Sequence, residues 1–201
     1  MKDATIVLDV FRQYHQVSTA SMFESWVQML HELRSTSSLD DIPWAAEAAF
    51  DVKRKVADRS IYHVLIWRYL SRMHTAYLVG AYELAETCGN IIALYAHEDM
   101  NFNSVTMSLF LRGLVAIARY RTTKRRKYKR VVQSVLKQFQ NWSSIGSGVN
   151  LLHRSHLLSA EWASANERAS KSQYDMAIYT ATRAGFLGDA ALANELAALS
   201  G

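Results

Sequence analysis

Apolar side chains recur at helical spacing along almost the whole chain, and this pattern constrains the fold more than any other feature. The clearest case is the series Tyr128, Val132, Val135, Phe139 and Trp142, whose members fall four, three, four and three residues apart. Such spacing puts the side chains on one stripe of an α-helix. The 201 residues include eight glycines and one proline. Glycine and proline together make up roughly 12% of an average protein, so this chain has unusually few of them. No segment alternates long enough to require a strand, so the sequence predicts an all-α protein.

The pattern predicts about seven to nine helices, separated by short polar breaks. Beyond residue 60 the expected helices cover residues 61–79, 81–96, 103–120, 128–142, 151–165, 172–185 and 190–199. Asparagine, serine and aspartate are favoured N-caps, so we expect caps at Asn150 and Asp189 and a capping box that starts at Ser172. Thr122 and Thr123 are expected to form a turn.

The compartment follows from cysteine usage and hydropathy. Cys88 is the only cysteine, which excludes a disulfide framework and a cysteine-rich zinc site. No apolar run reaches the 18 residues of a membrane span. Asp3, Asp9 and Arg12 interrupt the apolar stretch that a signal peptide would need. We therefore expect a cytoplasmic protein without a membrane span.

Three tyrosines suggest that the helices form repeated pairs. Tyr82, Tyr128 and Tyr174 are spaced 46 residues apart, each near the expected start of the second helix of a pair. The residue three positions after each tyrosine is small, which lets the two helices of a hairpin approach; these positions are Ala85, Val131 and Ala177. The period resembles long-helix variants of tetratricopeptide repeats or HEAT repeats. The alternative is a generic bundle with one shared core.

Seven segments follow one another in a familiar order, and the most specific reads Ala-Leu-Ala-Asn-Glu-Leu-Ala at residues 191–197. The segments cover residues 76–85, 136–142, 150–153, 157–161, 174–178, 184–186 and 190–198. They resemble the tetratricopeptide-like helical region of large multidomain signalling ATPases. Proteins of that kind join a serine/threonine-kinase-like domain, an AAA-type or STAND-like ATPase, this helical region, and GAF and histidine-kinase or cyclase modules. The chain has no phosphate loop and no kinase motif, so none of the catalytic residues of those domains is carried over.

The resemblance implies a right-handed solenoid of antiparallel helix pairs. Residues 1–59 are expected to be N-terminal helices that continue or cap the array, and residues 60–201 to form about three pairs, the last one incomplete. Leu192, Leu196 and Leu199 would then lack the capping partner that solenoids require. We expect that the chain is a piece of a longer protein and that its last helix offers a surface for self-association.

Residues 119–130 form a cationic cluster. They include eight lysines and arginines and no acid, so the rest of the chain, whose total net charge is +5, carries −3. Cations near the start of a helix oppose its dipole, which hints at an acidic partner. Nucleic acid is an alternative, although only Tyr120 and Tyr128 interleave the cations; an anionic lipid and a solvated loop tip are others. The expected partner-binding residues are Lys124, Arg125, Arg126, Lys127, Lys129 and Arg130.

No residue pattern predicts catalysis, a cofactor or a metal. His153 and His156 lie three apart, but Glu161 is expected to face elsewhere, and a metal site needs three or four ligands. The sequence therefore predicts a non-catalytic helical scaffold or regulatory arm of a signalling ATPase or kinase, which contacts a protein partner or adjacent domains. One alternative is a nucleic-acid-binding protein that uses the cationic cluster. Another is a small helical enzyme or ligand carrier, which would need a pocket with converging polar groups.

Overall fold

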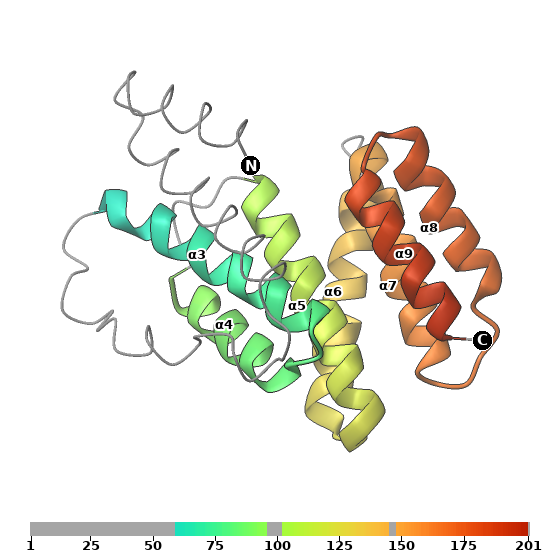
Figure 1. Ribbon diagram of the computed structural model, residues 1–201, viewed down its shortest axis with the longest axis horizontal. Coiled ribbons are helices and arrows are strands. Elements are labelled where there is room, and N and C mark those ends of the chain that lie inside the picture. Colours follow the sequence, from blue (N-terminus) through green and yellow to red (C-terminus); the bar gives the residue numbers. More distant parts are fainter. Residues whose placement is uncertain (1–58, 96–101, 145–147, 201) are drawn as a thin grey trace. The chain divides into compact units, whose positions relative to one another are not determined.

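The structure, a computed structural model, describes residues 59–95, 102–144 and 148–200 (Figure 1). Every regular element in these ranges is helical, which confirms the all-α prediction for this part of the chain. The helices predicted before residue 59 lie outside the described residues. The elements are α3 (Arg59–Leu78), α4 (Tyr82–Tyr95), α5 (Phe102–Thr123), α6 (Arg126–Ser144), the short 3-10 helix η4 (Gly148–Leu151), α7 (Leu152–Ser164), α8 (Lys171–Arg183) and α9 (Leu187–Leu199).

The chain divides into two compact units, between Ser108 and Leu109 within α5. In the first unit α3 packs against α4. Gly80 joins them with a φ of +78°, a left-handed conformation that glycine adopts without strain. Ala81 donates a backbone hydrogen bond of 2.8 Å to the carbonyl of Ala76, which closes the helix end as a Schellman motif. Met73 and Ala85, at most 1% exposed, fill the contact between the two helices.

In the second unit a two-residue link, Lys124 and Arg125, connects α5 to α6. The predicted turn at Thr122 and Thr123 is wrong, because both residues end α5. Their hydroxyls donate hydrogen bonds of 3.1 and 2.6 Å to the carbonyl of Arg119. Such hydroxyl bonds to the preceding turn let threonine sit within a helix, so the reversal comes two residues later.

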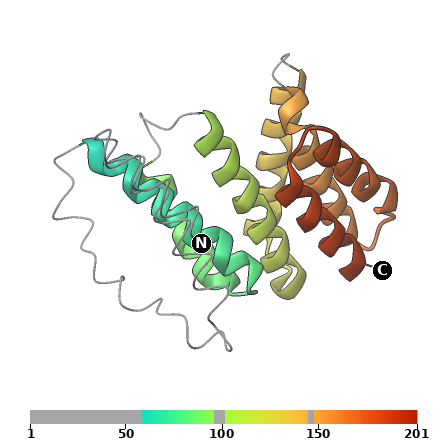
Figure 2. The same ribbon diagram turned by 45° about the horizontal axis from the view of Figure 1, so that its top comes forward.

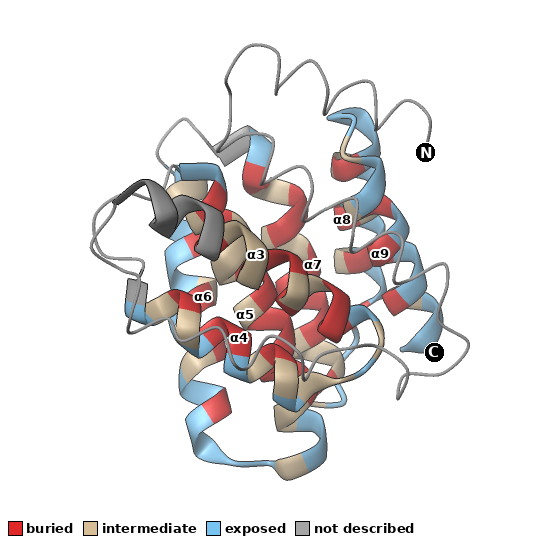
Figure 3. Ribbon diagram, turned by 60° about the vertical axis from the view of Figure 1, so that its left-hand side comes forward, coloured by how far each residue is buried: buried red, intermediate tan, exposed pale blue. Residues whose placement is uncertain are grey.

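The core of the second unit lies where α5, α6 and α7 converge. A Cβ atom at Gly113 of α5 would lie 2.7 Å from Leu158 of α7 and 3.1 Å from Val135 of α6. Glycine is therefore what lets these helices approach. Figure 3 shows the buried residues along the inner faces of these helices. Core residues that are at most 3% exposed are Phe110, Leu111, Leu114, Ile117, Val132, Val135, Phe139, Leu157 and Leu158.

The last three helices lie side by side (Figure 2). α6 packs on α7, α7 on α8 and α8 on α9, and α7 also contacts α9. Gly185, with a φ of +79°, ends α8 in the same way as Gly80 ends α3: the backbone N–H of Phe186 donates to the carbonyl of Ala181 at 2.9 Å. Each helix of this unit thus packs on its neighbours in the sequence.

The three predicted N-caps are wrong. Asn150 lies within η4, and Leu151 precedes α7. Ser172 is the second residue of α8, whose N-cap is Ser170. Asp189 is the third residue of α9. The local pattern of a polar residue before an apolar run located each helix to within a few residues, but it did not locate the first residue.

The expectation that three leucines of the last helix lack a packing partner is correct for one of them. Leu199 is 77% exposed, whereas Leu192 and Leu196 are 7% and 9% exposed. Burial of these two side chains follows from the packing of α9 on α8 and α7. The last described helix therefore completes part of the core.

Candidate functional site

The six cations predicted to contact a partner surround the link between α5 and α6, and all six are exposed. The same end of the hairpin is pale blue in Figure 3. We call residues 119–130 the cationic hairpin. Lys124 lies at the reversal with a φ of +52°, a conformation that costs a residue with a side chain roughly 1 kcal/mol. Glycine is the usual residue after a helix end of this kind, so this hairpin keeps a lysine at a strained position.

Three cations of the hairpin are tied into the fold. The Nε of Arg119 donates to the hydroxyl of Tyr128 at 3.2 Å, and Arg121 forms an ion pair of 2.9 Å with Glu161. The Nζ of Lys124 lies 3.5 Å from the carbonyl oxygen of Ala165, at the end of α7. Cations are favoured at the C-terminus of a helix, so the contacts of Arg121 and Lys124 join the hairpin to α7, whereas that of Arg119 lies within the hairpin.

Four other cations point away from such partners. Arg125, Arg126, Lys129 and Arg130 are exposed, and none has a carboxylate partner among the residues that the structure describes. We call them the outward quartet. Three of them belong to the first five residues of α6, which has no acid in its first turn. The positive end of the helix dipole therefore adds to their charge. The sequence predicted this unfavourable placement of cations at the start of a helix, and the structure shows it.

The positive surface continues along α6. Lys137, Gln133 and Ser134 are exposed and follow Arg126 and Arg130 at helical spacing. The 19 residues of α6 span about 28 Å. Residues 102–160 include eleven lysines and arginines and no aspartate or glutamate. This acid-free stretch is a sequence signal that the count over residues 119–130 alone misses.

The three spaced tyrosines lie in the first turn of α4, α6 and α8 and contact the helix before. Tyr82 is half-buried, and its ring lies 5.8 Å from that of Tyr77. Tyr128 and Tyr174 are 3% and 2% exposed and bond to Arg119 and Glu161. Among the small residues three positions later, Ala85 and Ala177 are buried and Val131 is half-buried.

A buried polar network, which the sequence did not indicate, connects α5, α7 and α8. Glu161 is 1% exposed; its carboxylate pairs with Arg121 and accepts a hydrogen bond from the hydroxyl of Tyr174. Burial raises the pKa of Glu161 and outweighs the hydrogen bond from Tyr174 and the charge of Arg121, which lower it. Burial and the neighbouring carboxylate raise the pKa of Tyr174 to about 12. The network fixes three helices through a single carboxylate.

A second polar cluster joins α7 to α9. The Nε2 of His153 lies 2.6 Å from Oδ2 of Asp189, and the Nε of Arg154 donates to the same oxygen at 2.8 Å. The His153 ring also stacks on Phe186 at 4.5 Å between centroids. Burial raises the pKa of Asp189, but the hydrogen bonds from His153 and Arg154 and the charges of these two residues together lower it by more. The pKa of Asp189 therefore lies below its ordinary value. Asp189 is therefore a tertiary partner and not the helix cap that the sequence suggested.

No group of three or more metal-ligating side chains gathers among the described residues. His156 is separate from the cluster around Asp189, and burial lowers its pKa. None of the helices in the described part of the chain has both the length and the hydropathy to cross a bilayer.

Comparisons of the chain with protein-family models, with curated protein sequences and with solved structures find no match.

Proposed function

We propose that the chain is a non-catalytic helical interaction module, in which α3–α4, α5–α6 and α7–α8 act as tetratricopeptide-like pairs of a right-handed solenoid. Two observations support the pairing. Successive helices pack on each other within each unit, and a tyrosine recurs every 46 residues at the start of the second helix of each pair. Solenoids of this kind present extended surfaces to partners. The proposed role of this chain as a regulatory arm of a signalling ATPase or kinase rests on the sequence resemblance alone.

The observation that carries the interaction role is the outward quartet. Four exposed cations without carboxylate partners in the described part of the chain lie at the positive end of α6, and the adjacent reversal holds Lys124 in a strained conformation. A local rule that is broken without a local gain is typical of a functional site. An acidic segment of a protein partner, or of an adjacent domain, would supply the missing negative charges and relieve the repulsion.

Binding of a labelled glutamate peptide of about 12 residues tests this proposal by fluorescence anisotropy. The double variant R126S/R130S removes two members of the outward quartet and should weaken binding at least about tenfold, since each lost charge contact contributes of the order of 1 kcal/mol. The matched control compares the single variant R130S with R183S, which removes one exposed cation of α8 outside the pocket and the hairpin and changes net charge equally. Equal losses in the two variants would reduce the effect to net charge and refute a specific surface.

A second candidate partner is nucleic acid, and the acid-free face of α6 favours it. Arg126, Arg130 and Lys137 follow one another along about 16 Å of helix, a length over which a duplex presents several phosphates. Four phosphate contacts by the outward quartet predict that log K falls with log[salt] with a slope of about −3.6 on duplex DNA. Anisotropy with a duplex of about 20 base pairs measures this slope. R126S/R130S should roughly halve it, and tighter binding of the glutamate peptide than of the duplex at the same salt would exclude this candidate.

A further inference from the structure

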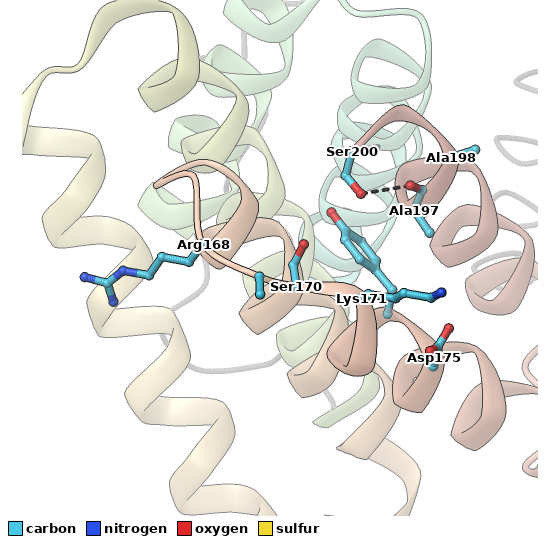
Figure 4. A pocket seen from close by; sticks show the side chains of 9 residues that line it. Arg168, Ser170, Lys171, Asp175, Ala197, Ala198 and Ser200 are labelled. Carbon is cyan, nitrogen blue, oxygen red and sulfur yellow. Dashed lines mark hydrogen bonds between the residues drawn. The ribbon is translucent and has the colours of Figure 1, made fainter.

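A pocket of about 450 Å³ opens at the start of α8. Figure 4 shows it between the loop that follows α7, the first turn of α8 and the C-terminal end of α9. Alanine methyl groups form part of its wall, and charged and hydroxyl side chains form the rest. The lining residues are Arg168, Ala169, Ser170, Lys171, Tyr174, Asp175, Ala197, Ala198 and Ser200. The volume is in the range of small-molecule sites.

Ser170 is the feature of this pocket that the fold leaves unexplained. It is the N-cap of α8 and only 9% exposed, yet its hydroxyl makes no capping hydrogen bond and has no other partner among the described residues. In Figure 4 the hydroxyl points into the space between the start of α8 and the end of α9. Ser170 is almost wholly buried and lines the pocket, so its hydroxyl is open to the pocket, where a ligand atom can form the hydrogen bond that the helix start does not supply.

The remaining half of a capping box is also unused. Gln173 is the third residue of α8, where its side chain could bond back to the N-cap, but its Oε1 atom is buried and has no partner within the described ranges. The backbone N–H groups of Lys171 and Ser172 have no acceptor within the helix, as at any helix start. Gln173 does not line the pocket, and its free oxygen is an acceptor. The donors at the start of α8 are the backbone N–H groups, which lie at the positive end of the helix dipole beside the pocket-lining Ser170 and Lys171.

The charges around the pocket indicate which ligand fits. Arg168 and Lys171 extend from its rim in different directions (Figure 4), and their long side chains are exposed, so their charged ends can turn toward a bound anion. Asp175 also lines the pocket and repels a second negative group. The hydroxyl of Ser200 bonds to the carbonyl of Ala197 at 2.8 Å, and that of Tyr174 is held by Glu161. One end of the pocket thus suits one anionic group, and the region near Asp175 suits a hydrogen-bond donor.

We propose that this pocket binds a small organic ligand through a single carboxylate or phosphate group. The anionic oxygens accept hydrogen bonds from the Ser170 hydroxyl and from the N–H groups at the start of α8, and Lys171 supplies the counter-charge. Helix N-termini bind anions in this way in many proteins. The site is separate from the cationic hairpin, since its donors come from α8 and the loop before it.

The test is an NMR titration of the ¹⁵N-labelled full chain with sodium phosphate, and separately with sodium acetate, against sodium chloride at constant ionic strength. The N–H signals of Lys171 and Ser172 should shift and saturate in the millimolar range, and the tighter of the two anions identifies the ligand group. Ser170→Ala should weaken binding about tenfold, the usual effect of losing a hydrogen bond to a charged group. Thr182→Ala, at an exposed position near the other end of α8, removes a hydroxyl outside the pocket; it is the control and should bind as the wild type does.

Two further variants separate this site from the hairpin and from a folding defect. R126S/R130S should leave the shifts at the start of α8 unchanged even if it abolishes binding at the hairpin. Lys171→Gln, at an exposed position, should weaken binding severalfold without touching the buried hydroxyl, and so decides the matter if Ser170→Ala unfolds. Absence of saturable shifts in α8, equal affinity of Ser170→Ala and the wild type, or shifts confined to the hairpin would overturn the proposal.

Discussion

Tyr174→Phe removes one buried hydroxyl and leaves the aromatic ring in place. The hydroxyl donates to the carboxylate of Glu161, and both residues are at most 2% exposed. Phenylalanine has nearly the same shape, so the change creates no large cavity and isolates the hydrogen bond. A hydrogen bond to a charged group contributes about 2 kcal/mol, and a buried carboxylate oxygen that loses its donor bears the cost of desolvation. We therefore expect the free energy of unfolding to fall by about 2 kcal/mol at neutral pH.

The pH dependence of this loss identifies its cause. Burial raises the pKa of Glu161 above its ordinary value of 4.5. The folded chain thus holds that proton more tightly than the unfolded chain, and the contribution of Glu161 to stability falls as the pH rises through the window above 4.5. Tyr174 favours the ionised carboxylate, so the variant should raise the pKa of Glu161 further. The deficit of the variant should be about half its full size where Glu161 is protonated and the hydrogen bond is neutral, and it should reach its full size above that window.

Urea unfolding followed by circular dichroism measures both effects, and a double-mutant cycle with Glu161→Gln assigns them. In the Glu161→Gln background the hydrogen bond is neutral, so Tyr174→Phe should cost only about 1 kcal/mol. Tyr179→Phe, on the exposed face of the same helix, is the control and should leave the unfolding midpoint unchanged. An equal cost of Tyr174→Phe in both backgrounds, or no cost at neutral pH, would refute the role given to the buried carboxylate.

Three further changes test other parts of the packing. Gly113→Ala puts a Cβ 2.7 Å from Leu158 and should lower the free energy of unfolding, measured in urea, by about 2 kcal/mol. At Gly188 a Cβ meets nothing within 4 Å, so Gly188→Ala should raise the free energy of unfolding by about 0.5 kcal/mol. Similar effects at the two sites would contradict the close approach of the helices at Gly113. Asp189→Asn leaves two buried basic groups without their carboxylate and should lower the free energy of unfolding by about 3 kcal/mol. Because the pKa of Asp189 is lowered, the wild type loses this stabilisation only as the pH falls below 3.8. If the variant were already as stable as the wild type at a pH of about 6, that result would be evidence against the pair. Cys88 is 3% exposed and burial raises its pKa to about 11, so a thiol reagent at a pH of about 8 should modify it only after unfolding, and rapid modification of the native chain would show that this part of α4 opens.

Helical spacing was sufficient to predict each of the described α-helices, because the burial of one stripe is a property of neighbouring residues. The caps could not be predicted in the same way. Asp189 has the composition and position of a cap, yet its carboxylate is taken by His153, which lies 36 residues earlier in the chain. A capping preference is worth about 1 kcal/mol, and a buried ionic contact competes with it only once the fold has brought the two helices together.

The cationic hairpin shows the same division between local and tertiary information. Counting charges located it, and the sequence predicted its exposure. The count could not show that Arg121 and Lys124 bind the end of α7, while Arg125 and Arg130 point outward. That distinction depends on which residues of α7 lie opposite, about 40 positions away. Glu161 was missed for the same reason, since a lone acid in an amphipathic helix is usually solvated.

The spaced tyrosines share a position in the hairpin and differ in chemistry. Each begins the second helix of a pair and contacts the last turns of the first helix, which Tyr77, Arg119 and Glu161 supply. An antiparallel hairpin always brings these two ends together, so each tyrosine finds its partner at most 13 positions away in the chain.

The loss of the hydroxyl should therefore differ at equivalent positions. Tyr82→Phe should cost less than about 0.5 kcal/mol, because Tyr82 is half-buried and contacts its neighbour through the ring. Tyr174→Phe should cost about 2 kcal/mol, because its hydroxyl serves a buried carboxylate. Unfolding of both variants in urea measures the difference. Equal costs would mean that the tyrosine hydroxyls have one shared role in every pair, and the contacts described for Tyr174 would not account for its contribution to stability.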